Sequence, residues 1–313
     1  MKHSVILLII ILFSFTGCIK VLNDDLKSEK TKLVVNGVIS PDTIISLNVS
    51  HTFNIFDAEI NENMPFIDNA TVKFYQDGEY LFDLENQDTG YYTKNFYPQT
   101  GKQYSITVSA PDYDDVSAET KIPLAVKIVK FDTTTTFYYE YDTKYMKLNA
   151  DLTYNDPPGE ENYYMLTGQY HLFYEQGDIN ETVELDLTVP EGEAELFDNA
   201  YGSYLLWSDK LINGQEVTIH FSYLQWYMGY GNGKEPLNMT FTFYFKSVSK
   251  DYYFYLKTLS LYHETNNIDP FMEPVVIYSN IKNGYGIFGS YNMDSAVIEK
   301  EIVDGINKEG GRP

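Results

Sequence analysis

Ala70-Thr71-Val72-Lys73-Phe74-Tyr75 is followed by Gln76-Asp77-Gly78-Glu79 and then by Tyr80-Leu81-Phe82-Asp83-Leu84. The two outer segments are rich in the β-branched and aromatic residues that favour strands. An Asp-Gly pair between two such segments indicates a tight hairpin, because both central residues of its turn need a positive φ. The stretch therefore predicts antiparallel β structure, and the chain on either side of it continues the pattern.

Residues 32–123 are expected to form one β domain around this hairpin. Residues 44–50, for example, alternate apolar and polar side chains, as a strand with one buried face should. About seven short strands separated by turn residues are typical of a sandwich of the immunoglobulin-like or carboxypeptidase-regulatory-like type. Besides the hairpin, strands are expected at 33–39, 44–50, 90–92 and 101–108 and before Pro123.

Residues 124–301 are expected to form a second, larger β-rich domain with one packed helix. The helix is predicted at about 249–265, because its apolar residues recur at helical spacing and a serine can cap its start. The polar, Gly-rich segment 302–313 is expected to be disordered. Strands are predicted at 127–131, 145–154, 163–174 and 182–189, with a long hairpin at 215–227 and 239–247. The fold class is therefore mainly β.

The N-terminus has the parts of an export signal: Lys2, an apolar run at 5–15 and a small residue at Gly17. The run is shorter than the roughly 20 apolar residues of a transmembrane helix. Phe15-Thr16-Gly17-Cys18 resembles the bacterial lipobox, and Cys18 is the only cysteine of the chain. An ordinary secretory signal with a chance cysteine is the alternative. We expect a lipoprotein signal peptide at 1–17, a lipid such as palmitate on Cys18, and a flexible tether at 18–31.

The composition excludes some classes of partner. The chain has 45 acidic and 22 basic residues and a formal net charge of −23 at pH 7. Nucleic acid and anionic membrane surfaces are therefore poor partners. Aromatic residues make up 16% of the chain, with 29 Tyr and 19 Phe, which supports the β prediction because such side chains pack well on half-buried sheets.

Catalytic motifs are missing from the sequence. It contains no Gly-x-Ser-x-Gly elbow, no His-Glu-x-x-His pair, no phosphate-binding glycine loop and no EF-hand spacing. His51, His171, His220 and His263 are isolated along the chain, so a structural role is predicted for each. We expect no enzyme activity and no cofactor.

The best predicted contact surface is an aromatic hairpin. Tyr and Trp side chains give large, stiff, amphipathic surfaces that stack on sugars or anchor a protein partner. The competing interpretation places the same side chains in the core of the sheet or between the domains. The candidate contacts are Tyr223, Trp226, Tyr227 and Tyr230.

A second, weaker candidate is the acidic loop that begins at Asp156. Oxygen ligands in a flexible loop suit Ca²⁺, and Asp156, Glu160 and Glu161 could supply them. A simple polar turn explains the same residues, because Asp, Pro, Gly and Asn favour turns.

Four segments resemble a Bacteroidota lipoprotein family grouped as domain of unknown function 4249. They are Leu33-Val34-Val35-Asn36-Gly37, the segment 207–214, the segment 270–274 and the segment 278–289. The residues that match the family motif are Pro270, Phe271, Glu273, Pro274, Asn280, Asn283, Gly284, Gly286 and Phe288. The resemblance implies a companion of a TonB-dependent receptor in nutrient uptake or envelope function, and it brings no catalytic residues.

Three functions follow from these observations. The first is a binding or accessory lipoprotein of the outer membrane that works with a TonB-dependent receptor, on the periplasmic face or on the cell surface. The second is a fimbrial or adhesin-type subunit, a class that assembles by exchange of strands. The third is a glycan hydrolase, for which only the acidity and the aromatic content argue.

Overall fold

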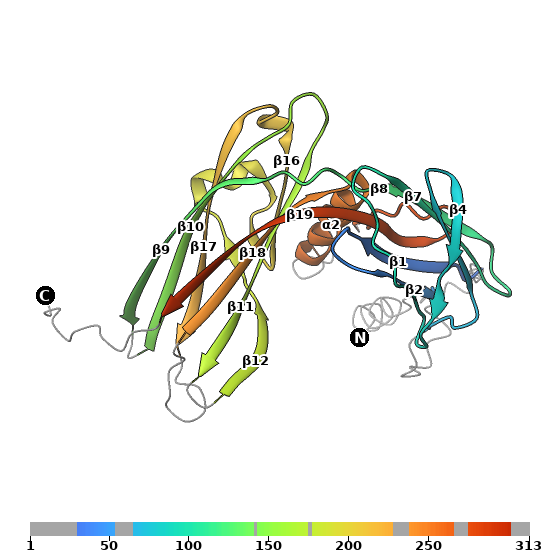
Figure 1. Ribbon diagram of the computed structural model, residues 1–313, viewed down its shortest axis with the longest axis horizontal. Coiled ribbons are helices and arrows are strands. Elements are labelled where there is room, and N and C mark those ends of the chain that lie inside the picture. Colours follow the sequence, from blue (N-terminus) through green and yellow to red (C-terminus); the bar gives the residue numbers. More distant parts are fainter. Residues whose placement is uncertain are drawn as a thin grey trace, which may run out of the picture.

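The structure is a computed structural model that describes residues 30–53, 65–140, 143–174, 177–227, 238–265 and 275–301 (Figure 1). This part of the chain is mainly β and contains one α-helix, as predicted. It forms two β-sandwiches that share one ten-stranded sheet, with the strand order β14-β16-β11-β18-β19-β1-β2-β6-β5 and β12 beside β11. None of the described helices is long and apolar enough to cross a membrane.

The first sandwich packs one end of the shared sheet against a four-stranded sheet. Its strands alternate buried and partly exposed side chains, and the buried ones form a single apolar core. The shared sheet contributes β1 (Leu33–Ile39), β2 (Ile45–His51), β5 (Glu85–Asn86) and β6 (Tyr91–Lys94). The second layer contains β3 (Thr71–Gln76), β4 (Glu79–Asp83), β7 (Gln103–Ser109) and β8 (Val116–Lys121), in the order β4-β3-β7-β8.

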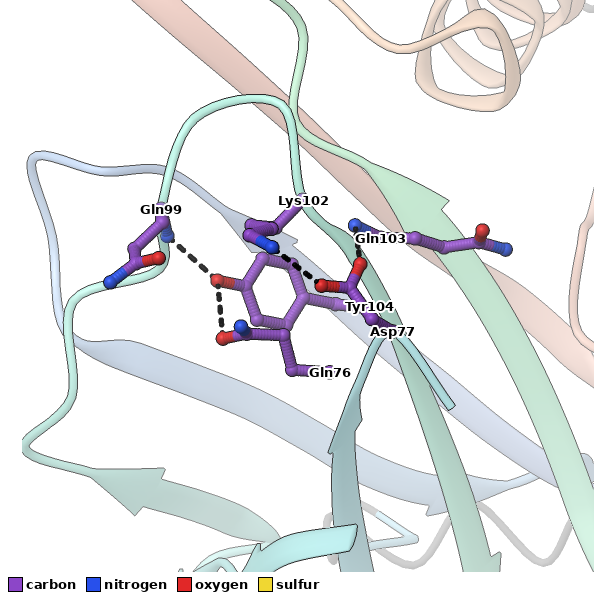
Figure 2. A network of polar contacts seen from close by, with 6 residues as sticks. All are labelled: Gln76, Asp77, Gln99, Lys102, Gln103 and Tyr104. Atoms are coloured by element: carbon purple, nitrogen blue, oxygen red, sulfur yellow. Dashed lines mark hydrogen bonds and ion pairs between the residues drawn. The ribbon is translucent and has the colours of Figure 1, made fainter. Parts of the chain in front are cut away.

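The Asp-Gly hairpin prediction is confirmed. Asp77 and Gly78 connect β3 to β4 with φ values of 51° and 86°. The Asp77 carboxylate also accepts hydrogen bonds from Lys102 Nζ at 2.8 Å and from the Gln103 amide at 3.2 Å, so the turn is tied to β7 (Figure 2). These contacts hold the pKa of Asp77 below its usual value, with the Lys102 hydrogen bond as the main cause.

A second chain of hydrogen bonds runs beside this turn. The Tyr104 hydroxyl donates to Gln76 Oε1 at 3.2 Å and accepts from the Gln99 amide at 2.7 Å (Figure 2). The Tyr104 ring itself is buried in the core beside Phe74. The residue therefore joins the apolar interior to the polar loop above it.

The second sandwich packs the other end of the shared sheet against a five-stranded sheet with the order β15-β13-β17-β10-β9. That sheet contains β9 (Ile128–Glu140), β10 (Thr143–Asn155), β13 (Leu187–Thr188), β15 (Tyr201–Gly202) and β17 (Glu216–Tyr227). The facing strands are β11 (Tyr163–Tyr174), β12 (Gly177–Glu184), β14 (Phe197–Asn199), β16 (Tyr204–Ser208) and β18 (Asn238–Val248). Two short 3₁₀ helices, η1 (Glu191–Leu196) and η2 (Asp209–Leu211), lie in the connections.

Large aromatic side chains fill this second core. Trp207 is fully buried, stacks on Phe245 with ring centroids 5.9 Å apart, and donates from Nε1 to the Tyr154 hydroxyl at 2.9 Å. Tyr164 packs against the same rings. The polar atoms of these aromatic residues find partners inside the core, as buried Trp and Tyr require.

The helix α2 (Lys250–Thr265) covers the outer face of the shared sheet, and the sequence predicted it within one residue of each end. Tyr253 and Leu256 form a third cluster with the outward-facing Tyr163, Met165 and Leu206. A third layer thus lies over the region where the two sandwiches meet (Figure 1).

The last strand, β19 (Tyr285–Glu301), belongs to both sandwiches. Residues 285–290 pair in parallel with β1, whereas residues 291–301 pair antiparallel with β18. Phe288 in this strand is buried in the first core, and so is Ile281, which precedes the strand. Residues 285–290 thus complete the sandwich that begins at residue 32, although the sequence analysis assigned them to the second domain.

Buried polar side chains fix the chain where β19 changes partners. Ser290 Oγ lies 3.0 Å from Thr120 Oγ1 and donates to the Lys121 carbonyl at 2.8 Å. Asn292 Nδ2 donates to the Pro123 carbonyl at 3.1 Å and to Thr100 Oγ1 at 3.0 Å. These bonds join β19 to the end of the first sandwich, so the two sandwiches are held together by more than a linker.

Replacing Gly78 by Val should destabilise the protein by about 1–2 kcal/mol, because a β-branched side chain is strained at positive φ. A Cβ at Gly78 would meet nothing within 4 Å, so the cost is conformational and not steric. Chemical denaturation measures the difference. Gly192→Val is the matched control, since Gly192 is equally open but has no positive φ, and a change there as large as at Gly78 would contradict the turn argument.

Candidate functional site

Two hairpin ends of the second sandwich and the end of β17 lie at the same end of the molecule, which we call the distal end. The predicted hairpin of 215–227 and 239–247 is wrong, because β17 and β18 lie in different sheets. β9 and β10 turn between Glu140 and Thr143, and β11 and β12 turn between Tyr174 and Gly177. The register of β10 and β17 places Tyr227 opposite Lys144, at the same level. Figure 1 shows these strand ends together at the lower left, far from the first sandwich.

An aromatic pair lies on the outer face of the five-stranded sheet at the distal end. The rings of Tyr138 and Tyr145 are stacked, with centroids 5.3 Å apart and planes 11° apart. Tyr138 is 39% exposed, and Leu224 on the same face is 45% exposed. Because β10 also pairs Tyr145 with Trp226, three aromatic residues follow one another across β9, β10 and β17.

Only part of the predicted aromatic surface is found there. Tyr223 is 6% exposed, and its ring packs against Tyr170 and Phe241 at 6.1 and 6.2 Å. It supports the distal end from inside and presents no surface to a partner, which corrects the prediction for this residue. Trp226 and Tyr227 lie in β17, but their side chains, like the whole of Tyr230, are outside the described residues.

Sequence reasoning missed Tyr138 and Tyr145. Their strands were predicted at 127–131 and 145–154, whereas β9 extends to Glu140 through a run of four threonines. Threonine is β-branched and favours strands, so the run continues β9 as far as the turn. The signal available in the sequence was Phe137-Tyr138-Tyr139 facing Tyr145 across a short connection.

Further along the same face, the side chains are polar and arranged in rows across the strands. His220 Nδ1 lies 2.6 Å from Asp151 Oδ1, and this contact is the main cause that raises the pKa of His220. Both groups are about half exposed, so water screens the pair and its contribution to stability is small. Hydroxyl pairs continue the rows, with Thr153 and Thr218 joined at 2.9 Å and Thr188 and Ser222 at 3.0 Å.

Asp156, the first residue of the calcium candidate, has a structural role instead. It is 4% exposed, accepts a hydrogen bond from the Tyr164 hydroxyl, and accepts another from the Gly214 amide at 2.7 Å. Burial raises the pKa of its carboxyl. The carboxylate thus joins the loop after β10 to the loop before β17.

The other two carboxylates of the candidate do not converge with Asp156. Glu161 accepts hydrogen bonds from the Tyr163 hydroxyl at 2.7 Å and from Lys250 at 3.1 Å, and Glu160 is exposed. Among the described residues, no group of three His, Cys, Asp or Glu side chains is arranged to hold a metal ion. The polar-turn interpretation therefore accounts for the described contacts of this loop.

The family-motif residues within the described chain close the first sandwich. Asn280 Nδ2 donates to the Phe288 carbonyl, and Asn280 Oδ1 accepts from the Phe288 amide, both at 2.9 Å. Asn283 has a positive φ of 64°, which turns the chain. Gly286 has a φ of 106°, and a Cβ added to it would lie only 2.1 Å from the Val35 carbonyl oxygen. Gly284 also lies close to backbone, since a Cβ added there would lie 2.6 Å from the Leu33 carbonyl oxygen.

This part of the motif therefore directs β19 onto β1 and is structural. Pro270, Phe271, Glu273 and Pro274 are outside the described residues. So is Cys18, together with the whole signal and most of the tether.

Replacing Asn280 by Ala should lower the free energy of unfolding by about 1–3 kcal/mol, because it leaves the backbone amide and carbonyl of Phe288 without their partners. Equilibrium unfolding in urea measures the loss. Asn48→Ala is the control, since the Asn48 amide makes only a 3.4 Å contact with the Thr89 carbonyl that we expect to matter little. Equal effects of the two substitutions would contradict the role assigned to Asn280.

Several tyrosine hydroxyls donate to carboxylates in partly buried places. Tyr278 donates to Asp251, Tyr253 donates to Asp198, and Tyr163 donates to Glu161. Burial and then the neighbouring carboxylate raise the pKa of Tyr278 to about 12, and the pKa values of Tyr163 and Tyr253 are raised for the same two reasons. Tyrosinate formation at these sites is therefore opposed by the fold.

The protein should consequently lose stability as the pH rises from about 10, where tyrosines of the unfolded chain ionise, through about 12, where Tyr278 ionises in the folded state. The folded state holds more protons than the unfolded state in this window, so deprotonation favours unfolding. Circular dichroism and tyrosinate absorbance, followed together, measure the effect. A smaller alkaline loss in Tyr278→Phe is expected, and a flat stability profile across the window would refute the assignment.

Comparison with known proteins gives a family but no activity. The family model described as Domain of unknown function (DUF4249) matches residues 19–296. No curated protein matches the chain. Among solved structures, one described as "Structural basis for the promiscuous specificity of the carbohydrate-binding modules from the beta-sandwich super family" aligns with 64% of this chain and 100% of that chain, at 12% identity and a TM-score of 0.20. That agreement is too low to transfer a function.

Proposed function

The chain belongs to the DUF4249 family, a domain of unknown function, and we propose that it is a lipid-anchored protein of the outer membrane that binds a partner and catalyses no reaction. The partner we propose is a TonB-dependent receptor, so that the protein takes part in nutrient uptake or envelope function. The lipobox at Cys18 supports the anchor, and the family resemblance supports the choice of partner.

The observation that carries the binding role is the aromatic outer face at the distal end. Stacked Tyr138 and Tyr145 and the exposed Leu224 provide amphipathic contact area on a sheet and not on a loop. Tyr170, Tyr223 and Phe241 pack beneath them, so the sheet is rigid where the exposed residues lie. A preorganised aromatic surface loses little entropy when it binds, and Tyr is among the residues that dominate binding energies.

The position of the distal end suits a tethered protein. The described chain begins at Lys30, which pairs with Asp114 of the first sandwich at 2.7 Å. Figure 1 shows this sandwich and the distal end at opposite ends of the molecule. An anchor at Cys18 would therefore keep the first sandwich near the membrane and present the distal end away from it.

Replacing Tyr138 or Tyr145 by Ala should reduce capture of the partner roughly tenfold or more, as truncation of a central aromatic contact does. The measurement is crosslinking of the tagged protein in intact cells, followed by affinity capture and mass spectrometry. Tyr91→Ala is the matched control, because Tyr91 is 47% exposed but lies on the first sandwich. Cys18→Ser tests the anchor separately and should release the protein from the membrane fraction.

Recovery of a TonB-dependent receptor with the original chain and with Tyr91→Ala, but not with Tyr138→Ala, supports the proposal. Capture without any outer-membrane receptor would refute the choice of partner. Equal capture by Tyr138→Ala and Tyr91→Ala would refute the assignment of the surface.

A further inference from the structure

β9 is the last strand of the five-stranded sheet and pairs along its whole length with β10 alone. Its other edge faces outward at the left margin of the second sandwich in Figure 1. Such an edge carries unpaired amide and carbonyl groups, which form a template for another strand. Proteins commonly block long edges with charges, prolines, bulges or a covering element.

The first part of the β9 edge is blocked in this way. The Ile128 amide donates to Asp294 Oδ2 of β19 at 3.0 Å, Lys130 pairs with Asp132, and the pairing of β9 with β10 is irregular near Lys130. These features close roughly the first third of the strand. The hydrogen bond to β19 thus lies at the start of the edge.

The next part of β9 differs from its start in sequence and in pairing. Residues 133–139 read Thr-Thr-Thr-Thr-Phe-Tyr-Tyr, with no charge, no proline and no glycine, and their pairing with β10 is regular. β-branched and aromatic residues have the highest preference for strands. This edge is therefore suited to accept another strand, and it is long enough to hold one in a defined register.

Thr135 at the middle of this segment gives a second, independent indication. Its Oγ1 is buried, and it is the only buried side-chain nitrogen or oxygen in the described chain that has no hydrogen-bond partner. A buried hydroxyl without a partner costs free energy. A hydroxyl brought alongside β9 by an added strand would satisfy it, since Thr–Thr pairs across strands form hydrogen bonds.

We propose that the β9 edge pairs antiparallel with the β9 edge of a second copy of this chain, about a two-fold axis at Thr135. In this register Thr135 faces its own counterpart, and Thr134 faces Thr136 of the second copy. The two five-stranded sheets become one continuous sheet.

The threonines favour a second copy over an unrelated strand, because the two-fold axis brings the Thr135 hydroxyl of one copy to the Thr135 hydroxyl of the other. Pairing of one strand edge buries little surface, so the dimer is weak and its formation depends on concentration at the membrane. The chain has a net charge of −23, so two copies repel each other at long range, and added salt should strengthen the association by screening. The inference does not depend on the proposed receptor, because it concerns the edge of the sheet and not its aromatic face.

The test is disulfide crosslinking of the full-length protein in its own membrane. Thr135→Cys places two cysteines directly opposite each other at the axis, where facing Cα atoms in antiparallel strands lie at distances that a disulfide can span. Mild oxidation should give roughly tenfold more covalent homodimer with Thr135→Cys than with Thr218→Cys. Thr218 is the control because it lies on β17, an inner strand of the same sheet.

The unsubstituted protein in detergent provides a second measurement that does not depend on how the variants fold. Sedimentation should show a monomer–dimer equilibrium that moves toward the dimer as salt rises. Thr134→Lys, which brings a charge to the centre of the pairing, should shift it toward the monomer. A monomer at all concentrations, with no homodimer from Thr135→Cys, would overturn the proposal, and so would crosslinks from Thr135→Cys to a different protein.

Discussion

The change of partner within β19 is the constraint on which the rest of the structure depends. One strand pairs in parallel with β1 through residue 290 and antiparallel with β18 from residue 291. Two sandwiches therefore share a sheet, and neither is complete without this strand. The close approach of Gly286 to Val35, the Asn280 clamp on Phe288 and the buried contacts of Ser290 all serve to hold β19 in that path.

The aromatic residues of the second sandwich fall into two groups, one buried in the core and one on the outer face of the sheet. One group of large rings, among them Trp207, Tyr154 and Phe245, fills the second core, and the Trp207 Nε1 donates to the Tyr154 hydroxyl inside it. Others, such as Tyr138, lie on the outer face of the sheet. The second group depends on the first, because a surface residue can be preorganised for binding only when the strand below it is rigid.

The two parts of the β9 edge differ in how strongly they are blocked from pairing with another strand. The amide of Ile128 at the start of β9 is bonded to Asp294, and charged residues follow it, whereas residues 133–139 contain no charge, proline or glycine. The acidic surface keeps separate molecules apart in dilute solution. In the proposed anchoring at a membrane, the molecules would be concentrated in two dimensions, and the proposed pairing of the β9 edges would be specific but weak.

The sequence by itself determined the features that depend on near neighbours. The Asp77-Gly78 turn, the helix at 250–265 and the alternating strands of the first sandwich follow from turn chemistry and from hydrophobic periodicity, and all are found. Only the tertiary structure decided that Tyr223 points inward while Tyr138 and Tyr145 share a surface, that Asp156 joins two loops, and that Phe288 belongs to the first core. The reason is that strand register and the pairing of distant strands depend on packing across the whole molecule, which no local pattern of residues encodes.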